Sequence, residues 1–198
     1  MAGPARYDNR SVSLGSTSLG YRIGGEGERR LVLLHGLNSH SGTWRKCFDR
    51  LARDATVVAP SLPPSSGSGT SELADRYADQ VLAVCEDAGI GRAAFVGSSM
   101  GGWVAMRLVS RQGRLVSRLV LEDTAGGASA DADAVERSGR PVLIVWGESD
   151  PVLTLASGRT LHSKLTRSEL RVIPGAGHVP HWEAPDEFLM AVDGFLRA

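Results

Sequence analysis

The sequence predicts an α/β fold in which a mainly parallel central sheet is covered by helices on both faces. Short runs rich in Val, Leu and Ile recur between longer segments of helical periodicity, a rhythm typical of repeated strand–helix–strand units. Most of these runs are apolar at nearly every position, as expected for strands that are buried on both faces. With its 198 residues, the chain is expected to form a single domain over residues 1–198.

The expected strands begin with a hairpin and continue with six buried runs. Ser11–Leu14 and Ser18–Ile23 alternate in character around the turn Gly15-Ser16-Thr17, which is typical of an antiparallel edge. The six later strands share an almost unbroken apolar composition and are Leu31–Leu34, Thr56–Ala59, Ala93–Val96, Arg118–Leu121, Val142–Trp146 and Leu170–Ile173.

Helical patterns fill the intervals between these strands. The five expected helices are Gly42–Arg53, Ser71–Ala88, Met100–Arg111, Thr154–Leu165 and Pro185–Leu196. The last two begin beside Pro151 and Pro185, and proline is favoured in the first turn of a helix. Pro60–Thr70 and Gly126–Ala134 are rich in small and turn-forming residues and are expected to be surface loops.

The composition is that of an ordinary globular protein and excludes several classes of partner. Lys+Arg and Asp+Glu are balanced at 22 each, so neither nucleic acid nor an anionic membrane surface is expected as a partner. Cys47 and Cys85 lack the spacing of a disulfide framework or a zinc site. No apolar signal region and no run of ~18 apolar residues is visible. We therefore expect a cytoplasmic monomer or homodimer with no metal and no cofactor.

A serine nucleophile is predicted at Ser99. The segment Gly97-Ser98-Ser99-Met100-Gly101 fits the pattern G-x-S-x-G and stands directly between a predicted strand and a predicted helix. The two glycines leave room for a sharp turn in which a β-carbon would clash. The start of the helix directs free N–H groups toward negative charge that forms beside Ser99. Ser98 is an alternative nucleophile that the glycine spacing disfavours.

His178 is the predicted general base. A serine hydroxyl is a poor nucleophile at neutral pH, and an imidazole is the usual base that activates it. His178 lies in a glycine-rich loop directly after Leu170–Ile173, at the strand end where active sites of open α/β sheets form. His181 is expected to pack or hydrogen-bond nearby, His162 to lie on a helix surface, and His35 to be structural.

The imidazole also requires a carboxylate on its other nitrogen, which fixes its tautomer. Asp150, at the end of the penultimate strand, is the preferred candidate. Asp123 follows the strand Arg118–Leu121 and is its rival, and Glu148 is a close neighbour.

Backbone amides complete the predicted site. The N–H groups of Leu37, after the first buried strand, and of Met100 are expected to form an oxyanion hole for the charge that develops in acyl transfer. Trp44, Ser98 and Val152 are further expected contacts of the substrate.

Four segments of the chain resemble the α/β-hydrolase superfamily, in particular its esterase, perhydrolase and meta-cleavage-product hydrolase branch. They are LVLLHGLNSHSGTW at Leu31–Trp44, FVGSSMGGWVAMRL at Phe95–Leu108, PVLIVWGESDPV at Pro141–Val152 and VIPGAGHVPHWEAPDEF at Val172–Phe188. The resemblance covers nearly the whole chain, and its motifs follow the family's order of Ser, Asp and His. It implies an α/β-hydrolase fold with nucleophile Ser99, acid Asp150, base His178 and oxyanion donors Leu37 and Met100.

The chain departs from this pattern in two places. Relatives usually carry Asp in a segment like APDLRGHGRS, where this chain has Ser61, which alters a turn near the site. Relatives also usually insert a mostly helical cap after the strand that ends here at Asp123, whereas only Thr124–Arg140 precedes the next strand. Such a short connection builds at most a loop and one short helix. We expect the cap to be reduced to this short connection, and the cleft to be open.

Three functional hypotheses follow. The first is a carboxylesterase-like serine hydrolase that cleaves an ester, thioester or lactone of a small molecule through an acyl-enzyme. The second is a perhydrolase, a C–C bond hydrolase or a lyase on the same triad. The third is a non-catalytic ligand-binding or interaction protein on a hydrolase fold. Labelling of Ser99 by a fluorophosphonate separates the first from the third.

Overall fold

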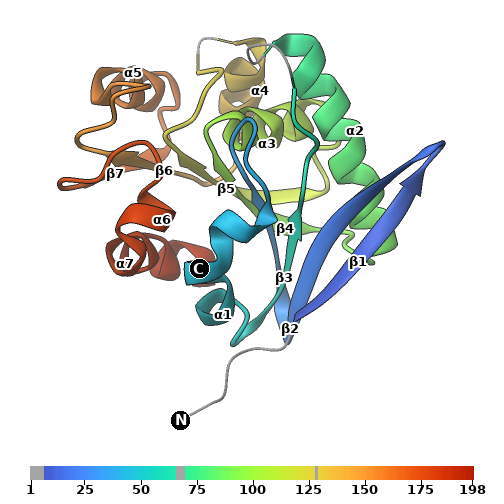
Figure 1. Ribbon diagram of the computed structural model, residues 1–198. Coiled ribbons are helices and arrows are strands. Elements are labelled where there is room, and N and C mark those ends of the chain that lie inside the picture. Colours follow the sequence, from blue (N-terminus) through green and yellow to red (C-terminus); the bar gives the residue numbers. More distant parts are fainter. Residues whose placement is uncertain (1–6, 66–69, 128) are drawn as a thin grey trace.

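A seven-stranded sheet forms the centre of the computed structural model, which describes residues 7–65, 70–127 and 129–198 (Figure 1). Its strands are β1 (Tyr7–Leu14), β2 (Thr17–Leu34), β3 (Ala55–Pro60), β4 (Ala93–Ser98), β5 (Val116–Glu122), β6 (Val142–Gly147) and β7 (Ser168–Ile173). The strand order is β1-β2-β4-β5-β6-β7, with β3 paired to β2. The pairs from β2–β4 through β6–β7 are all parallel, so the predicted fold class is confirmed.

Strand β2 unites two segments that the sequence predicted as separate strands, Ser18–Ile23 and Leu31–Leu34. Its first part pairs antiparallel with β1, both parts pair antiparallel with β3, and its last four residues pair parallel with β4. The glycines between the two parts suggested a break, but they allow a bend instead. Gly25 has a φ of 79°, and a β-carbon at Gly27 would lie 2.0 Å from the carbonyl oxygen of Asp54. The interval is therefore a bend within one strand.

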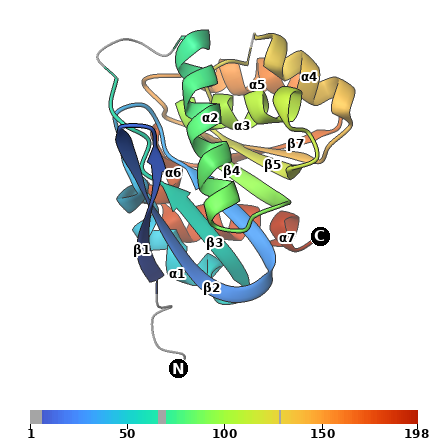
Figure 2. The ribbon, with the colours of Figure 1, turned by 90° about the vertical axis from the view of Figure 1, so that its right-hand side faces the viewer.

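Helices cover both faces of the sheet (Figure 2). They are η1 (Ser41–Trp44), α1 (Arg45–Leu51), α2 (Ser71–Asp87), α3 (Met100–Arg111), α4 (Ala130–Ser138), α5 (Leu155–Lys164), α6 (Pro180–Glu183) and α7 (Pro185–Arg197). One core cluster joins α2, α3, α4 and α5 to the sheet, and a second cluster joins α1 and α7 to the opposite face. In β2, Val32 and Leu34 belong to the first cluster and Leu31 and Leu33 to the second, because successive side chains of a strand point to opposite faces. This two-sided burial explains the unbroken apolar runs.

Helix α4 occupies much of the short connection Thr124–Arg140. The surface loop predicted over Gly126–Ala134 is therefore wrong in its second half, which is helical. The carboxylate of Asp131, in the first turn of α4, accepts hydrogen bonds from the indole N–H of Trp103 at 2.9 Å and from Nε of Arg107 at 2.8 Å. These contacts with α3 hold α4 on the core, and they come from residues more than 20 positions away in the chain.

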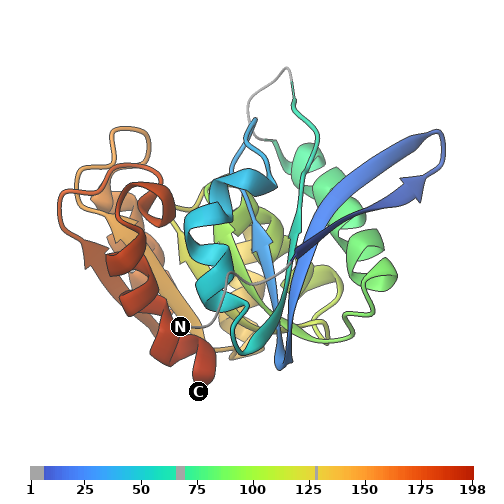
Figure 3. The same ribbon diagram turned by 60° about the horizontal axis from the view of Figure 1, so that its bottom comes forward.

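The β1–β2 hairpin forms one edge of the sheet. Figure 3 shows the β1–β2 hairpin extending past the helices at one edge. Of the predicted loop Pro60–Thr70, Ser61–Ser65 is irregular as expected, whereas residues 66–69 lie outside the described residues. None of the helices in the described parts of the chain combines the length and apolar character needed to cross a bilayer.

The carboxyl ends of the parallel strands meet at one edge of the sheet, because parallel strands run in the same direction. The segments that begin there are 35–37 after β2, Ser99 after β4, Asp123 after β5, 148–150 after β6 and 174–178 after β7. The fold thus gathers the predicted site residues from five separate segments.

Candidate active site

The turn that carries Ser99 is strained and crowded. Ser99 joins β4 to α3 with φ 51° and ψ −115°, a conformation that side-chain-bearing residues rarely adopt. A β-carbon at Gly97 would lie 2.5 Å from the backbone of Gly101, and one at Gly101 would lie 2.3 Å from the carbonyl oxygen of Leu34. Only glycine fits at these two positions, which accounts for the spacing of the motif.

Ser99, His178 and Asp150 form one hydrogen-bonded chain. Nε2 of His178 lies 3.1 Å from Oγ of Ser99, a residue 79 positions away in the sequence, and Nδ1 lies 2.7 Å from Oδ2 of Asp150. An ionised Asp150 accepts a hydrogen bond from Nδ1–H of His178, which keeps the proton on Nδ1 and leaves the lone pair of Nε2 directed at the serine hydroxyl. The geometry suits transfer of the serine proton to the imidazole.

The carboxylate of Asp150 is held in its ionised form. Oδ1 accepts hydrogen bonds from the backbone N–H groups of Val152 and Leu153, with N···O distances of 2.7 and 3.0 Å. Burial opposes ionisation, but the hydrogen bonds from His178 and from these two amides outweigh it and keep the pKa of Asp150 below its usual range. Asp150 is therefore negatively charged at neutral pH.

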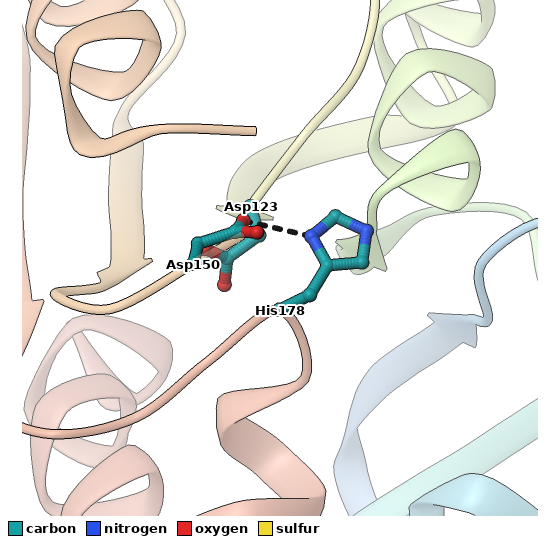
Figure 4. A group of neighbouring side chains, drawn as sticks. All are labelled: Asp123, Asp150 and His178. Carbon is teal, nitrogen blue, oxygen red and sulfur yellow. Dashed lines mark hydrogen bonds and ion pairs between the residues drawn. The ribbon is translucent and has the colours of Figure 1, made fainter. Parts of the chain in front are cut away.

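The rival acid, Asp123, lies behind Asp150 and does not bond to the imidazole. Figure 4 shows the two carboxyl groups beside the ring of His178, and ligand atoms of all three residues lie within 4.8 Å of one another. Oδ1 of Asp123 accepts the N–H of Gly147 at 2.9 Å. Burial, together with the negative charges of Glu122 and Asp150, raises the pKa of Asp123 to about 10. The surroundings of Asp123 thus favour its protonated form, whereas those of Asp150 favour the ionised form.

Glu148, the third candidate acid, bonds to the loop before His178 and not to the imidazole. Its Oε2 accepts the N–H of Gly175 at 3.1 Å, in the loop that leads to His178. Glu148 thus supports the loop and leaves the imidazole to Asp150.

The predicted oxyanion donors border the side chain of Ser99. A β-carbon at Gly36 would lie 3.3 Å from Cβ of Ser99, so the loop that contains Leu37 passes directly against the serine. Met100 is the first residue of α3, and the first N–H groups of a helix have no acceptor within it. The assignment of Leu37 and Met100 as oxyanion donors remains a prediction.

His35 shapes this loop. Its Nδ1 lies 2.7 Å from the carbonyl oxygen of Gly36, and its Nε2 accepts the N–H of Leu62 at 2.9 Å. Burial lowers the pKa of His35 to about 4, so the ring is neutral and its proton resides on Nδ1. The structural role expected for His35 is confirmed.

The three residues predicted to contact the substrate differ in their exposure to solvent. Trp44 is 0% exposed and stacks on His181 with ring centroids 3.8 Å apart, and Ser98 is 2% exposed. The expectation that these two residues contact the substrate is wrong, because η1 turns Trp44 into the core and Ser98 ends a strand that is buried on both faces. Val152 is 64% exposed, and its contact with substrate remains a prediction.

A second buried carboxylate–histidine pair, Glu122 and His181, lies beside the site; the packing and hydrogen bonding expected of His181 are confirmed, whereas the sequence did not identify Glu122 as its partner. Oε2 of Glu122 lies 2.6 Å from Nδ1 of His181, its Oε1 accepts the N–H of His181 at 2.7 Å, and the hydroxyl of Thr43 lies 3.1 Å from Nε2. The N–H groups of Gly42 and Thr43 are both bonded to His40, so they are not available to hold an oxyanion there. The pair fastens α6, and with it the loop of His178, to β5 and η1. The position of Glu122 at the carboxyl end of a predicted strand was the one feature of the sequence that could have indicated this pair.

A hollow of about 630 Å³ is lined in part by residues that hydrogen-bond to the Ser99–His178–Asp150 chain. The hydroxyl of Thr124, on its wall, donates to the carbonyl oxygen of Ser99 at 3.1 Å, and Leu153 donates its N–H to Asp150. The remaining lining comes from Trp103, Ala125, Gly126, Gly127, Ser129, Ala156, Ser157, Thr160 and Leu161. The hollow is thus mainly apolar, and two of its lining residues contact Ser99 and Asp150.

Comparisons with known sequences identify alpha/beta hydrolases as the relatives of this chain. A model described as the alpha/beta hydrolase family matches residues 31–134, and one described as the alpha/beta hydrolase fold matches residues 127–185. An uncharacterized protein of Mycobacterium tuberculosis is 24% identical over 266 residues, which cover 89% of this chain and 77% of the relative. Because that match is longer than the 198 residues here, the relative contains segments without a counterpart in this chain. A pimeloyl-[acyl-carrier protein] methyl ester esterase of Nitrosomonas europaea is 34% identical over 126 residues, 63% of this chain and 45% of the esterase.

Solved structures share the fold. A predicted CIB-like hydrolase of Thermoplasma acidophilum has a TM-score of 0.84 at 21% identity, covering 98% of this chain and 100% of the other. The enol-lactonase of Burkholderia xenovorans has a TM-score of 0.82 at 20% identity, covering 96% of this chain and 100% of the other. At these identities the likeness concerns the fold alone.

Proposed function

From the premise that the chain belongs to the alpha/beta hydrolase family, we propose that it is a serine hydrolase that cleaves a carboxylic ester through an acyl-enzyme on Ser99. The observation that carries this proposal is the hydrogen-bonded chain of Ser99, His178 and Asp150, with distances of 3.1 and 2.7 Å. Relatives described as an esterase and as a lipase give it further support.

In the acylation step, Oγ of Ser99 attacks the carbonyl carbon of the ester while Nε2 of His178 takes the hydroxyl proton. The carbonyl oxygen becomes an oxyanion, which the N–H groups of Leu37 and Met100 stabilise. Collapse of this intermediate expels the alcohol, which leaves with the proton from His178. Asp150 keeps the imidazole in its tautomer and stabilises its positive charge.

In the deacylation step, water takes the place of the alcohol. His178 accepts a proton from the water as its oxygen attacks the acyl carbon. When this second intermediate collapses, Oγ of Ser99 leaves and takes the proton back from His178, so the carboxylic acid is released and both residues are restored. A thioester or a lactone reacts in the same way, since only the leaving group changes.

The hollow beside Ser99 suits an extended, apolar acyl group. Its walls include Leu153, Ala156 and Leu161, and its volume of about 630 Å³ exceeds what an acetyl group occupies. The connection Thr124–Arg140 holds only α4 in the place of a cap, so we propose that the acyl group is received in an open cleft.

Replacing Ala156 by leucine is expected to alter the chain-length preference. The larger side chain fills part of the hollow, so kcat/KM for long-chain p-nitrophenyl esters should fall about tenfold relative to that for the acetate. Ser163→Leu, on the same helix but outside the hollow, is the matched control and should keep the wild-type ratio. An unchanged ratio in Ala156→Leu would place the acyl group elsewhere.

The acyl-enzyme itself is tested with a fluorophosphonate and with burst kinetics. Wild-type protein is expected to take up one equivalent of label and to release one equivalent of p-nitrophenol in the burst, whereas Ser99→Ala should do neither. Folded wild-type protein that neither reacts with the label nor turns over any ester would support the ligand-binding hypothesis instead.

Removal of metal ions is expected to leave turnover unchanged. Asp123, Asp150 and His178 lie close enough to hold a cation, but both oxygens of Asp150 and both ring nitrogens of His178 already have hydrogen-bond partners. The arrangement thus favours proton transfer over metal ligation. Dialysis against EDTA followed by an ester assay checks this; activity that is lost and then restored by a divalent metal would contradict it.

A further inference from the structure

One oxygen of Asp123 is buried without a hydrogen-bond donor. Within the part of the chain that the structure describes, no N–H or O–H group donates to Oδ2, although the residue is completely buried. Oδ1 has a donor, the N–H of Gly147 at 2.9 Å. An ionised carboxylate in this position would leave a charged oxygen unsolvated, at a large cost in free energy.

The neighbouring carboxyl group of Asp150 has the opposite surroundings. Three N–H groups donate to it, from Val152, Leu153 and His178, and an anion is what three donors stabilise. Two negative charges within 4.8 Å of each other repel strongly in a buried site. One of the two groups must therefore keep its proton, and Asp123 is the one with fewer donors.

We propose that Asp123 is a neutral carboxylic acid that donates its Oδ2 proton to the carboxylate of Asp150 and so positions the acid of the triad. In its consequence for turnover the inference rests on the proposed function; the protonation state of Asp123 does not. A buried carboxylic acid that is kept neutral in order to donate a hydrogen bond is known chemistry for enzyme sites.

Three features of Asp123 support this role: two hydrogen bonds to β6 and its own backbone conformation. Its own N–H donates to the carbonyl oxygen of Val145 in β6 at 3.0 Å, and its side chain holds the N–H of Gly147, three residues before Asp150. Its φ of 40° is strained for a residue with a side chain, and such strain is retained where the surrounding structure requires it. Asp123 therefore fixes both the turn that carries Asp150 and the carboxylate of Asp150.

The charged groups that face Asp123 both raise its pKa. Glu122, next to it in β5, and Asp150, after β6, are negative neighbours, and together with burial they raise the pKa of Asp123 to about 10. Glu122 is engaged by His181 from α6, and Asp150 by His178 from the loop after β7. Neither imidazole forms a hydrogen bond with Asp123 in the part of the chain that the structure describes.

The first test is the pH dependence of stability in wild type and Asp123→Asn. Unfolded Asp123 loses its proton above pH ~4, whereas folded Asp123 keeps it up to a pKa of about 10. The contribution of Asp123 to stability is therefore greatest below pH ~4 and declines as the pH rises. Between pH 5 and 9 the unfolding constant of wild type, divided by that of Asp123→Asn, should rise about tenfold per pH unit.

Denaturant titrations at a series of pH values measure this ratio. Asp8→Asn, at an exposed side chain, is the control and should give a flat ratio. A flat ratio for Asp123→Asn would mean that the folded protein holds a charged Asp123, and would overturn the inference.

The second test separates a positioning role from a merely structural one. Asparagine still donates to Asp150 and accepts from Gly147, so Asp123→Asn should retain most of the turnover and the acid limb of the wild-type pH profile. Leucine branches at Cγ as aspartate does but cannot donate, and Asp123→Leu should lower kcat about 10–100-fold with little change in KM. A shifted acid limb in the asparagine variant, or equal kcat in the leucine variant, contradicts the inference. If wild type hydrolyses no ester, the proposed function fails, and the stability ratio alone decides the state of Asp123.

Discussion

Replacement of Ser99 by alanine is expected to lower kcat for ester hydrolysis by about 10⁶-fold, the scale seen when one member of a catalytic unit is removed. The variant lacks the oxygen that attacks the ester, so only substrate binding and the oxyanion donors remain. The fold should persist, because among the described residues the serine hydroxyl makes one hydrogen bond, with Nε2 of His178. Steady-state turnover of a chromogenic ester, together with thermal unfolding of both proteins, measures the two effects separately.

Ser98→Ala is the matched control for this experiment. Ser98 is adjacent to Ser99 but ends β4 with its side chain buried, so its removal should cost far less turnover. Wild-type activity in Ser99→Ala would remove Ser99 from the mechanism, and a large loss in Ser98→Ala alone would make Ser98 the nucleophile.

The second-largest effect is expected for Asp150→Asn, with a loss in kcat of about 10⁴-fold. The asparagine amide donates a hydrogen bond to Nδ1 of His178, so the ring proton moves to Nε2. A protonated Nε2 cannot accept the proton of Ser99, which lies 3.1 Å away. Turnover of the same chromogenic ester, measured beside wild type, gives the size of the loss.

The oxygen of the new amide can still accept the N–H groups of Val152 and Leu153, so the loss of stability should be small and is checked by thermal unfolding. Asp123→Asn is the comparison, and its loss should be much smaller. The reverse order of the two losses would make Asp123 the acid that serves His178.

Predictions from the sequence succeeded where neighbouring residues carry the whole pattern. The turn around Ser99 needs a strand, two glycines and a helix in immediate succession, so a local motif describes it completely. The helix Met100–Arg111 was predicted with the bounds that the structure shows. The apolar runs identified the strands, because burial on both faces leaves few polar positions along the central ones; β7, at the edge of the sheet, retains Glu169 and Arg171.

The same reasoning failed where distant residues decide the outcome. Helix α4 depends on contacts of Asp131 with Trp103 and Arg107, and its own composition of small and acidic residues resembles a loop. Trp44 is adjacent to a loop of the site, but its indole packs on His181 in the core. Sequence adjacency does not give the direction in which a side chain points.

The fold class, the sharp turn at Ser99 and the glycine-rich loop of His178 could all be predicted from the amino-acid sequence, because they follow from local backbone demands and from periodic burial. Only the tertiary structure decided which of two acids at the same sheet edge faces the imidazole. Asp150 and Asp123 both follow strands, and they differ in the donors that surround them: three N–H groups around Asp150, and one beside Asp123. The number of donors depends on packing between segments far apart in the chain, and it sets which carboxyl group carries the charge.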